Sequence, residues 1–71
     1  MQYVIEIKGM HCAHCAAAVT KALGAIEGVD AVNVDFMRKI AFVDAKSELA
    51  EAVVSAVIDD VGFDFLSMQK L

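Results

Sequence analysis

The segment QYVIEIKGMHCAHCAAAVTKAL, residues 2–23, changes its hydrophobic period part-way along. Polar and apolar side chains alternate over residues 2–8, which predicts a strand that ends at Gly9. One face of this strand consists of Tyr3, Ile5 and Ile7. Over residues 13–26 the alanines favour a helix, which we expect Gly28 to stop. This helix carries an apolar stripe at helical spacing, formed by Cys15, Val19, Ala22, Leu23 and Ile26.

The rest of the chain predicts two more strands, a second helix and a last strand. VDAVNVDF, residues 29–36, alternates like a strand, and a hairpin tip at residues 37–39 leads into a third strand over residues 39–43. Ser47 is a suitable N-cap for a helix that Gly62 stops, and residues 63–68 form the fourth strand. We expect the second helix to bury Leu49, Val53, Ala56, Val57 and Val61.

The order strand-helix-strand-strand-helix-strand is typical of an α+β, ferredoxin-like βαββαβ fold. This fold has a four-stranded antiparallel sheet with both helices on one face, and its first strand lies between the third and the fourth. Tyr3, Ile5 and Ile7 are expected to face the helices, because the opposite parity of that strand carries Glu6 and Lys8. On the second strand, the same reasoning turns Val32, Val34 and Phe36 inward.

Length and charge narrow the function classes. The 71 residues, 59% of them hydrophobic, are predicted to form one domain, residues 1–71, with a small core. A net charge of −4 argues against nucleic acid as the main partner. It is compatible with docking onto a basic surface of another protein. The chain has neither a basic, apolar leader nor a run of about 18 apolar residues, so we expect no membrane insertion and a cytoplasmic location, where thiols stay reduced.

Four potential metal ligands crowd into residues 11–15, namely His11, Cys12, His14 and Cys15. The predicted start of a helix at this point favours thiolates, which are the form that binds soft metals. A thiol–disulfide pair is one interpretation, although the chain is short and has no Trp and no Pro. Structural zinc is a second, but four ligands from one short loop would strain it. The third is a two-thiolate site for a soft ion such as Cu(I).

The pattern Gly9-Met10-x-Cys12-x-x-Cys15, in the loop after the first strand, resembles the heavy-metal-associated domain. Small copper chaperones and the cytosolic metal-binding domains of copper-pumping P-type ATPases have this fold. The segments GVDAVNVDF and DDVGFDF extend the resemblance over nearly the whole chain. The resemblance implies that Cys12 and Cys15 bind Cu(I), with Ag(I), Hg(II) or Zn(II) as other ions that the site could take in vitro. It also implies that Met10 packs beneath the loop without ligating.

The resemblance further implies a carrier and not an enzyme. We expect a cytosolic copper chaperone that passes Cu(I) by ligand exchange to the metal-binding domain of a copper-transporting ATPase, and that forms Cu(I)-bridged homodimers. Phe63, whose ring lies near the metal loop in this fold, is more typical of the ATPase domains, so such a domain is the alternative. A thiol redox protein and a zinc or mercury module are further alternatives. His14, and after it His11, are candidate third ligands or neighbours that tune the site.

The family pattern also predicts an apolar patch on the open face of the sheet. It turns Ala41 and Val43 inward on the third strand, and on the last strand the same parity turns Phe65 inward. The outward side chains would then form a contiguous patch of Val4, Ile40, Phe42, Leu66 and Met68. A patch of this kind usually marks a contact with a partner or a second copy.

Overall fold

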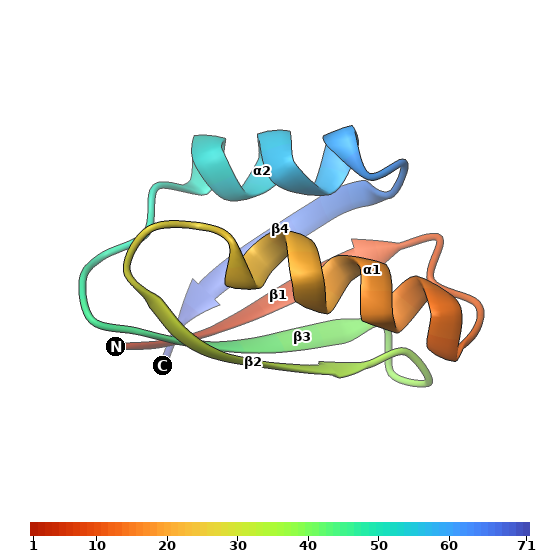
Figure 1. The fold of residues 1–71 in the computed structure, drawn as a ribbon, viewed down its shortest axis with the longest axis horizontal. Helices are drawn as coiled ribbons and strands as arrows, with labels where there is room; N and C mark the ends of the chain where they lie inside the picture. The colour runs from red at the N-terminus through yellow and green to blue at the C-terminus, as the bar shows by residue number, and fades with distance from the viewer.

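The strands and helices follow one another in the predicted order. The computed structural model describes all residues, 1–71. The elements are β1 (Gln2–Lys8), α1 (Ala13–Gly24), β2 (Val29–Asp35), β3 (Ile40–Ala45), α2 (Glu51–Asp60) and β4 (Asp64–Lys70). The strands form one antiparallel sheet in the order β2-β3-β1-β4, and both helices cover one of its faces (Figure 1). The ferredoxin-like prediction, with β1 between β3 and β4, is therefore confirmed.

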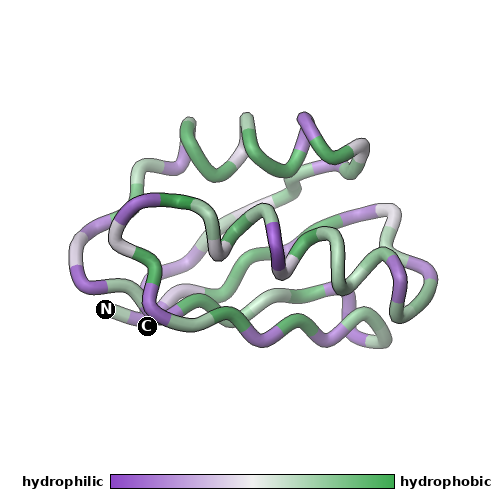
Figure 2. The backbone as a smooth tube through the Cα atoms, viewed as in Figure 1, coloured by the Kyte–Doolittle hydropathy of each residue, from purple (hydrophilic) through white to green (hydrophobic).

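The core lies between the sheet and the two helices. The inward faces predicted for β1 and β3 are correct, and their buried side chains are Tyr3, Ile5, Ile7, Ala41 and Val43. Figure 2 shows the matching alternation of hydrophilic and hydrophobic residues along β2. From above the sheet, α1 buries Val19 and Leu23. No helix in the structure is long and apolar enough to cross a membrane.

The helix α1 matches its predicted stripe and ends slightly early. Besides Val19 and Leu23, which are buried, Cys15 and Ile26 pack against the core. The helix ends at Gly24, and the turn that follows carries Gly28 at φ +91°. Glycine suits this position because a Cβ would make φ in this region costly. The stop predicted at Gly28 is thus the end of the turn and not the end of the helix.

The second helix differs from its prediction in both its start and its buried face. It begins at Glu51 after the N-cap residue Ala50, and Ser47 makes no cap. It buries Val54 and Ile58 against the sheet, whereas Val53 is 48% exposed. Ala56 is exposed as well, while Leu49 is buried as expected. Apolar residues at 53, 54, 57 and 58 give this helix two candidate faces, and its period alone does not choose between them.

A hydrogen bond to β1 fixes the chain just before α2. The backbone N–H of Leu49 donates to the hydroxyl of Tyr3 at 3.0 Å, in the buried interior. The phenol therefore has a partner inside the core, as buried tyrosines usually do. The bond holds Leu49 two residues before the start of α2, which buries Val54 and Ile58.

A β-bulge in β4 changes which of its side chains face the core. In the pairing with β1, Ile7 lies opposite Phe65 but Ile5 lies opposite Met68, so one extra residue is inserted in β4. Phe65 faces inward as predicted. Met68 also packs against the core, so its predicted outward position is wrong. Leu66, at the insertion, is 54% exposed.

The predicted patch on the open sheet face is consequently smaller. Phe42 faces outward as predicted, is 39% exposed and lies opposite Val4, while Ile40 lies opposite Glu6. On its other side Phe42 lies opposite Asn33, and beyond Val4 is Gln69. Polar neighbours therefore flank the remaining apolar side chains in both directions across the sheet.

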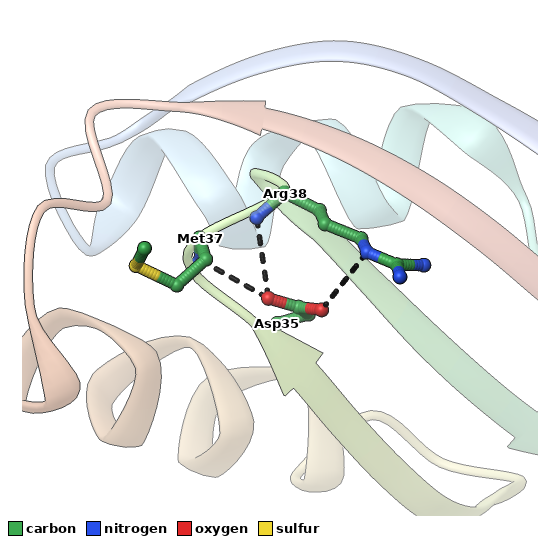
Figure 3. Close-up of polar contacts among 3 residues, drawn as sticks. All are labelled: Asp35, Met37 and Arg38. Carbon is green, nitrogen blue, oxygen red and sulfur yellow. Dashed lines mark hydrogen bonds and ion pairs between the residues drawn. The ribbon is translucent and has the colours of Figure 1, made fainter.

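The hairpin between β2 and β3 turns at the predicted residues, and Asp35 organises it. One carboxylate oxygen of Asp35 accepts hydrogen bonds from the backbone N–H groups of Met37 at 3.1 Å and Arg38 at 3.2 Å. The other oxygen pairs with Nε of Arg38 at 3.6 Å (Figure 3). The carbonyl of Lys39 accepts from the N–H of Ile7 at 3.0 Å, so the hairpin is tied to the end of β1.

The bulge predicts that two nearby substitutions in β4 differ strongly in their effect on stability. Met68→Lys would place a charge against the core and should lower the free energy of unfolding by about 2 kcal/mol or more. Leu66→Lys places the same charge in water and should change it by less than about 0.5 kcal/mol. Urea unfolding of both variants measures the difference, and equal losses would contradict the bulge.

Candidate metal centre

The loop between β1 and α1 rests on two contacts beneath it. Gly9 has φ +106°, and a Cβ built on it would lie 3.2 Å from Cδ1 of Phe63, so the Phe63 ring packs against the backbone of Gly9. Met10 follows and is only 2% exposed, within the main core. Sequence reasoning treated Gly9 only as the end of a strand. A glycine placed directly between a strand and a loop was the available signal for a positive φ.

The two cysteines lie side by side at the start of α1. Cys12 is the N-cap residue, with extended backbone (φ −158°, ψ 174°), and its carbonyl accepts the N–H of Ala16 at 3.1 Å. Cys15 lies in the first turn of the helix. Their Sγ atoms are 3.7 Å apart, and neither is in a disulfide. Cys12 is exposed and Cys15 is half-buried, so the pair opens to solvent on the side of Cys12.

The start of the helix makes Cys12 acidic. Its sulfur completes no capping hydrogen bond of ordinary geometry. Even so, the backbone N–H of Cys15, then the side chain of Cys15, then the backbone N–H of His14 hold the pKa of the Cys12 thiol below its usual value. These groups stabilise the thiolate because they direct positive charge at the sulfur, and burial opposes them only weakly. The structure therefore provides one thiolate that is both exposed and easily formed.

The two histidines do not join the cysteines in a preformed cluster. His11 and His14 are both exposed. Nowhere in the chain do three or more His, Cys, Asp or Glu side chains converge closely enough to hold a metal ion. Coordination by His14 or His11 would therefore require a rearrangement of their side chains or of the loop, and their roles stay predictions. As it stands, the site presents two free, adjacent sulfur atoms, one of which is exposed to solvent.

Comparison with known proteins points to one family. The model of the heavy-metal-associated domain matches residues 4–64. A probable copper-transporting ATPase of Synechococcus, SynA, is 39% identical over 62 residues, which are 84% of this chain and 8% of the ATPase. The copper chaperone CopZ of Staphylococcus aureus is 31% identical over 64 residues, which are 89% of this chain and 94% of the chaperone.

A solved structure extends this similarity to the fold. The structure described as CopZ metallochaperone superposes with a TM-score of 0.84 at 31% identity, covering 93% of this chain and all of that one. The chain thus spans less than a tenth of the ATPase SynA and nearly the full length of a chaperone relative.

The positive φ of Gly9 predicts a costly substitution at the base of the loop. Gly9→Ala forces a Cβ into a disfavoured backbone region and against Phe63, and it should lower the free energy of unfolding by about 1–3 kcal/mol. Gly24→Ala is the matched control, because nothing lies within 4 Å of a Cβ there and the residue is helical. It should raise the stability by about 0.5–1 kcal/mol. Thermal or urea unfolding compares the two, and similar effects would contradict the loop geometry.

The lowered pKa of Cys12 predicts that this residue is alkylated rapidly at pH values below those at which an ordinary thiol reacts. In Cys15→Ser the backbone N–H of residue 15 remains, so the Cys12 thiolate should still form at a lower pH than a free thiol. The pH dependence of iodoacetamide labelling measures the midpoint. Repeating it in strong urea should move the midpoint up, because unfolding removes the helix start. An unchanged midpoint on unfolding would show that the fold does not lower this pKa.

Proposed function

Because the chain belongs to the heavy-metal-associated domain family, we propose that it carries Cu(I) on the thiolates of Cys12 and Cys15 and passes it to a partner by ligand exchange. The observation that carries this proposal is the pair of sulfurs 3.7 Å apart at the start of α1, one exposed and one half-buried, with no third ligand preformed beside them. Cu(I) is soft and prefers thiolates. A structural zinc site would instead be closed by four ligands.

The geometry of the loop supports loading with little rearrangement. Two metal–sulfur bonds of about 2.3 Å each, arranged in line, place the sulfurs about 4.6 Å apart. The distance between the two sulfurs would therefore have to increase from 3.7 Å by roughly 1 Å when the metal binds. Cys12 is suited to make that shift because it is exposed and lies outside the helix, whereas Cys15 is held in the first turn of α1.

Transfer follows from the same asymmetry between the two cysteines. A thiolate of the partner approaches from the solvent side and binds the ion as a third sulfur. Cys12, the more exposed ligand, then leaves as a thiolate, and Cys15 leaves as a thiolate after a second partner thiolate has bound. Met10 takes no part as a ligand in this proposal, since its side chain is buried in the core. His14, or less readily His11, would bind only as a temporary third ligand.

The partner in this proposal is the metal-binding domain of a copper-transporting ATPase. We propose a free cytoplasmic chaperone formed by the single domain 1–71, which the near full-length match to the chaperone CopZ supports. A metal-binding domain of such an ATPase is the second candidate, supported by the 39% identity to SynA and by Phe63. No catalytic residue belongs to either function. Without small thiols, the exposed Cu(I) site should also bridge two copies, which light scattering detects as a doubled mass.

The experiment that tests the carrier function is an anaerobic Cu(I) titration against a strong Cu(I) chelator, with Zn(II) in parallel. The chain should take up about one Cu(I), and Cys12→Ser or Cys15→Ser should abolish tight binding while the apo protein keeps its melting curve. Met10→Leu is the control, since it removes a sulfur from the core and should leave Cu(I) affinity unchanged, at a stability cost below about 1.5 kcal/mol. Unfolding of either apo cysteine variant, or preferential uptake of Zn(II), would contradict the proposal.

A further inference from the structure

The two helices leave an apolar groove between them on the surface of the molecule. It consists of two adjoining hollows, one of about 500 Å³ and one of about 490 Å³, which share Ala22, Ala25 and Val57. Its walls are formed mainly by Ala18, Ala22 and Ala25 on the side of α1 and by Val53, Val57 and Val61 on the side of α2. Neither cysteine contributes to it, so the groove is separate from the metal loop.

The apolar wall on the side of α2 is only partly covered by the rest of the chain, since Val53 is 48% exposed and Val57 is half-buried. This helix buries Val54 and Ile58 against the sheet, Val53 lines the groove, and Val57 both lines the groove and packs against the core. Figure 2 shows hydrophobic residues following one another along most of α2. Val53, Val57 and Val61 are spaced four apart, as are Ala18 and Ala22 across the groove. Rows with this spacing form the ridges on which another helix packs.

The charges beside the groove are almost all negative. Residues 13–27 and 48–61, which comprise the helices and their ends, carry five carboxylates and one cation. The carboxylates are Glu27, Glu48, Glu51, Asp59 and Asp60, and the cation is Lys21. The rest of the chain holds the remaining five carboxylates and five cations, so the helical layer accounts for the whole net charge of −4. Glu27 and Glu48 line one hollow, and Asp60 lines the other beside Lys21.

We propose that this groove is a docking site for a basic amphipathic helix of a partner protein. The apolar ridge of that helix lies between α1 and α2, and its Lys or Arg side chains pair with the carboxylates at the rim. An anionic membrane surface does not fit, because the helical layer would repel it. A second copy of the chain fits poorly for the same reason, since each copy would present the same negative face. The partner can dock while the thiolates at the end of α1 stay free.

A designed peptide tests the docking site directly. The probe is a helix of leucine, alanine and lysine, about 18 residues long, with leucines spaced four apart and lysines on both flanks. Such a helix spans about 27 Å, close to the 29 Å long axis of the molecule. The matched peptide carries glutamate in place of lysine. Binding to the reduced, metal-free chain is measured by fluorescence anisotropy and mapped by amide chemical shifts.

We expect the lysine peptide to bind at least tenfold more tightly than the glutamate peptide and to shift amides along residues 18–27 and 49–61. Glu48→Lys should weaken binding about tenfold. Asp44→Lys makes the same charge change at an exposed position of β3 that lines neither hollow, and it should weaken binding less than twofold, because salt screens charges beyond about 8 Å. Cys12→Ser should bind the peptide as the unchanged chain does, so the result does not depend on metal binding.

Three outcomes would overturn the docking site. One is amide shifts confined to the sheet face or the metal loop. Another is an equal loss of affinity in Glu48→Lys and Asp44→Lys, which would show attraction to net charge alone. The third is self-association of the metal-free chain that depends on its concentration and differs between the unchanged chain and Glu48→Lys. Such a result would assign the groove to a second copy.

Discussion

The packing of Phe63 against Gly9 supports the base of the loop that leads to the two cysteines. A pair of sulfurs can be open to solvent and still keep a fixed separation only if the loop that carries them is anchored from below. Gly9 provides a backbone without a side chain, so the Phe63 ring approaches closely, and Met10 then enters the core as the next residue. Cys12 begins the helix immediately beyond these anchors.

Much of this arrangement could be predicted from the sequence, because the first half of the chain has one clear hydrophobic face per element. Alternation in β1 left a single choice of inward side chains, and the stripe of α1 was similarly unique. The spacing of the cysteines singled them out, and the family resemblance implied their role as ligands, which stays a prediction. The contact between Gly9 and Phe63 could not be derived from the residues, since the two lie far apart in the chain, and the family resemblance implied only that the Phe63 ring lies near the loop.

The predictions failed for the buried face of α2 and for the outward position of Met68, and the two failures have the same cause. Residues 53, 54, 57 and 58 make α2 apolar on two adjacent faces, so its period fits either orientation, and the helix adopts the one that buries Val54 and Ile58. In β4 the insertion at Leu66 reverses the parity of everything after it, and no alternation rule detects an inserted residue. Both errors concern surfaces that are apolar on more than one side. The excess apolar face of α2 is also the wall of the interhelical groove.

The placement of the chain ends has a consequence for how the domain can be connected. The two termini lie side by side at the end of the molecule opposite the loop that carries the cysteines (Figure 1). The last residue is tied in, because the N–H of Leu71 donates to the carbonyl of Gln2 at 2.8 Å. A linker joined to either end would leave the metal loop unobstructed. A tethered copy would present its thiolates to a neighbouring domain at a high effective concentration, and a free copy would expose the same face by diffusion. One architecture therefore serves as well in a chain of tandem modules as alone.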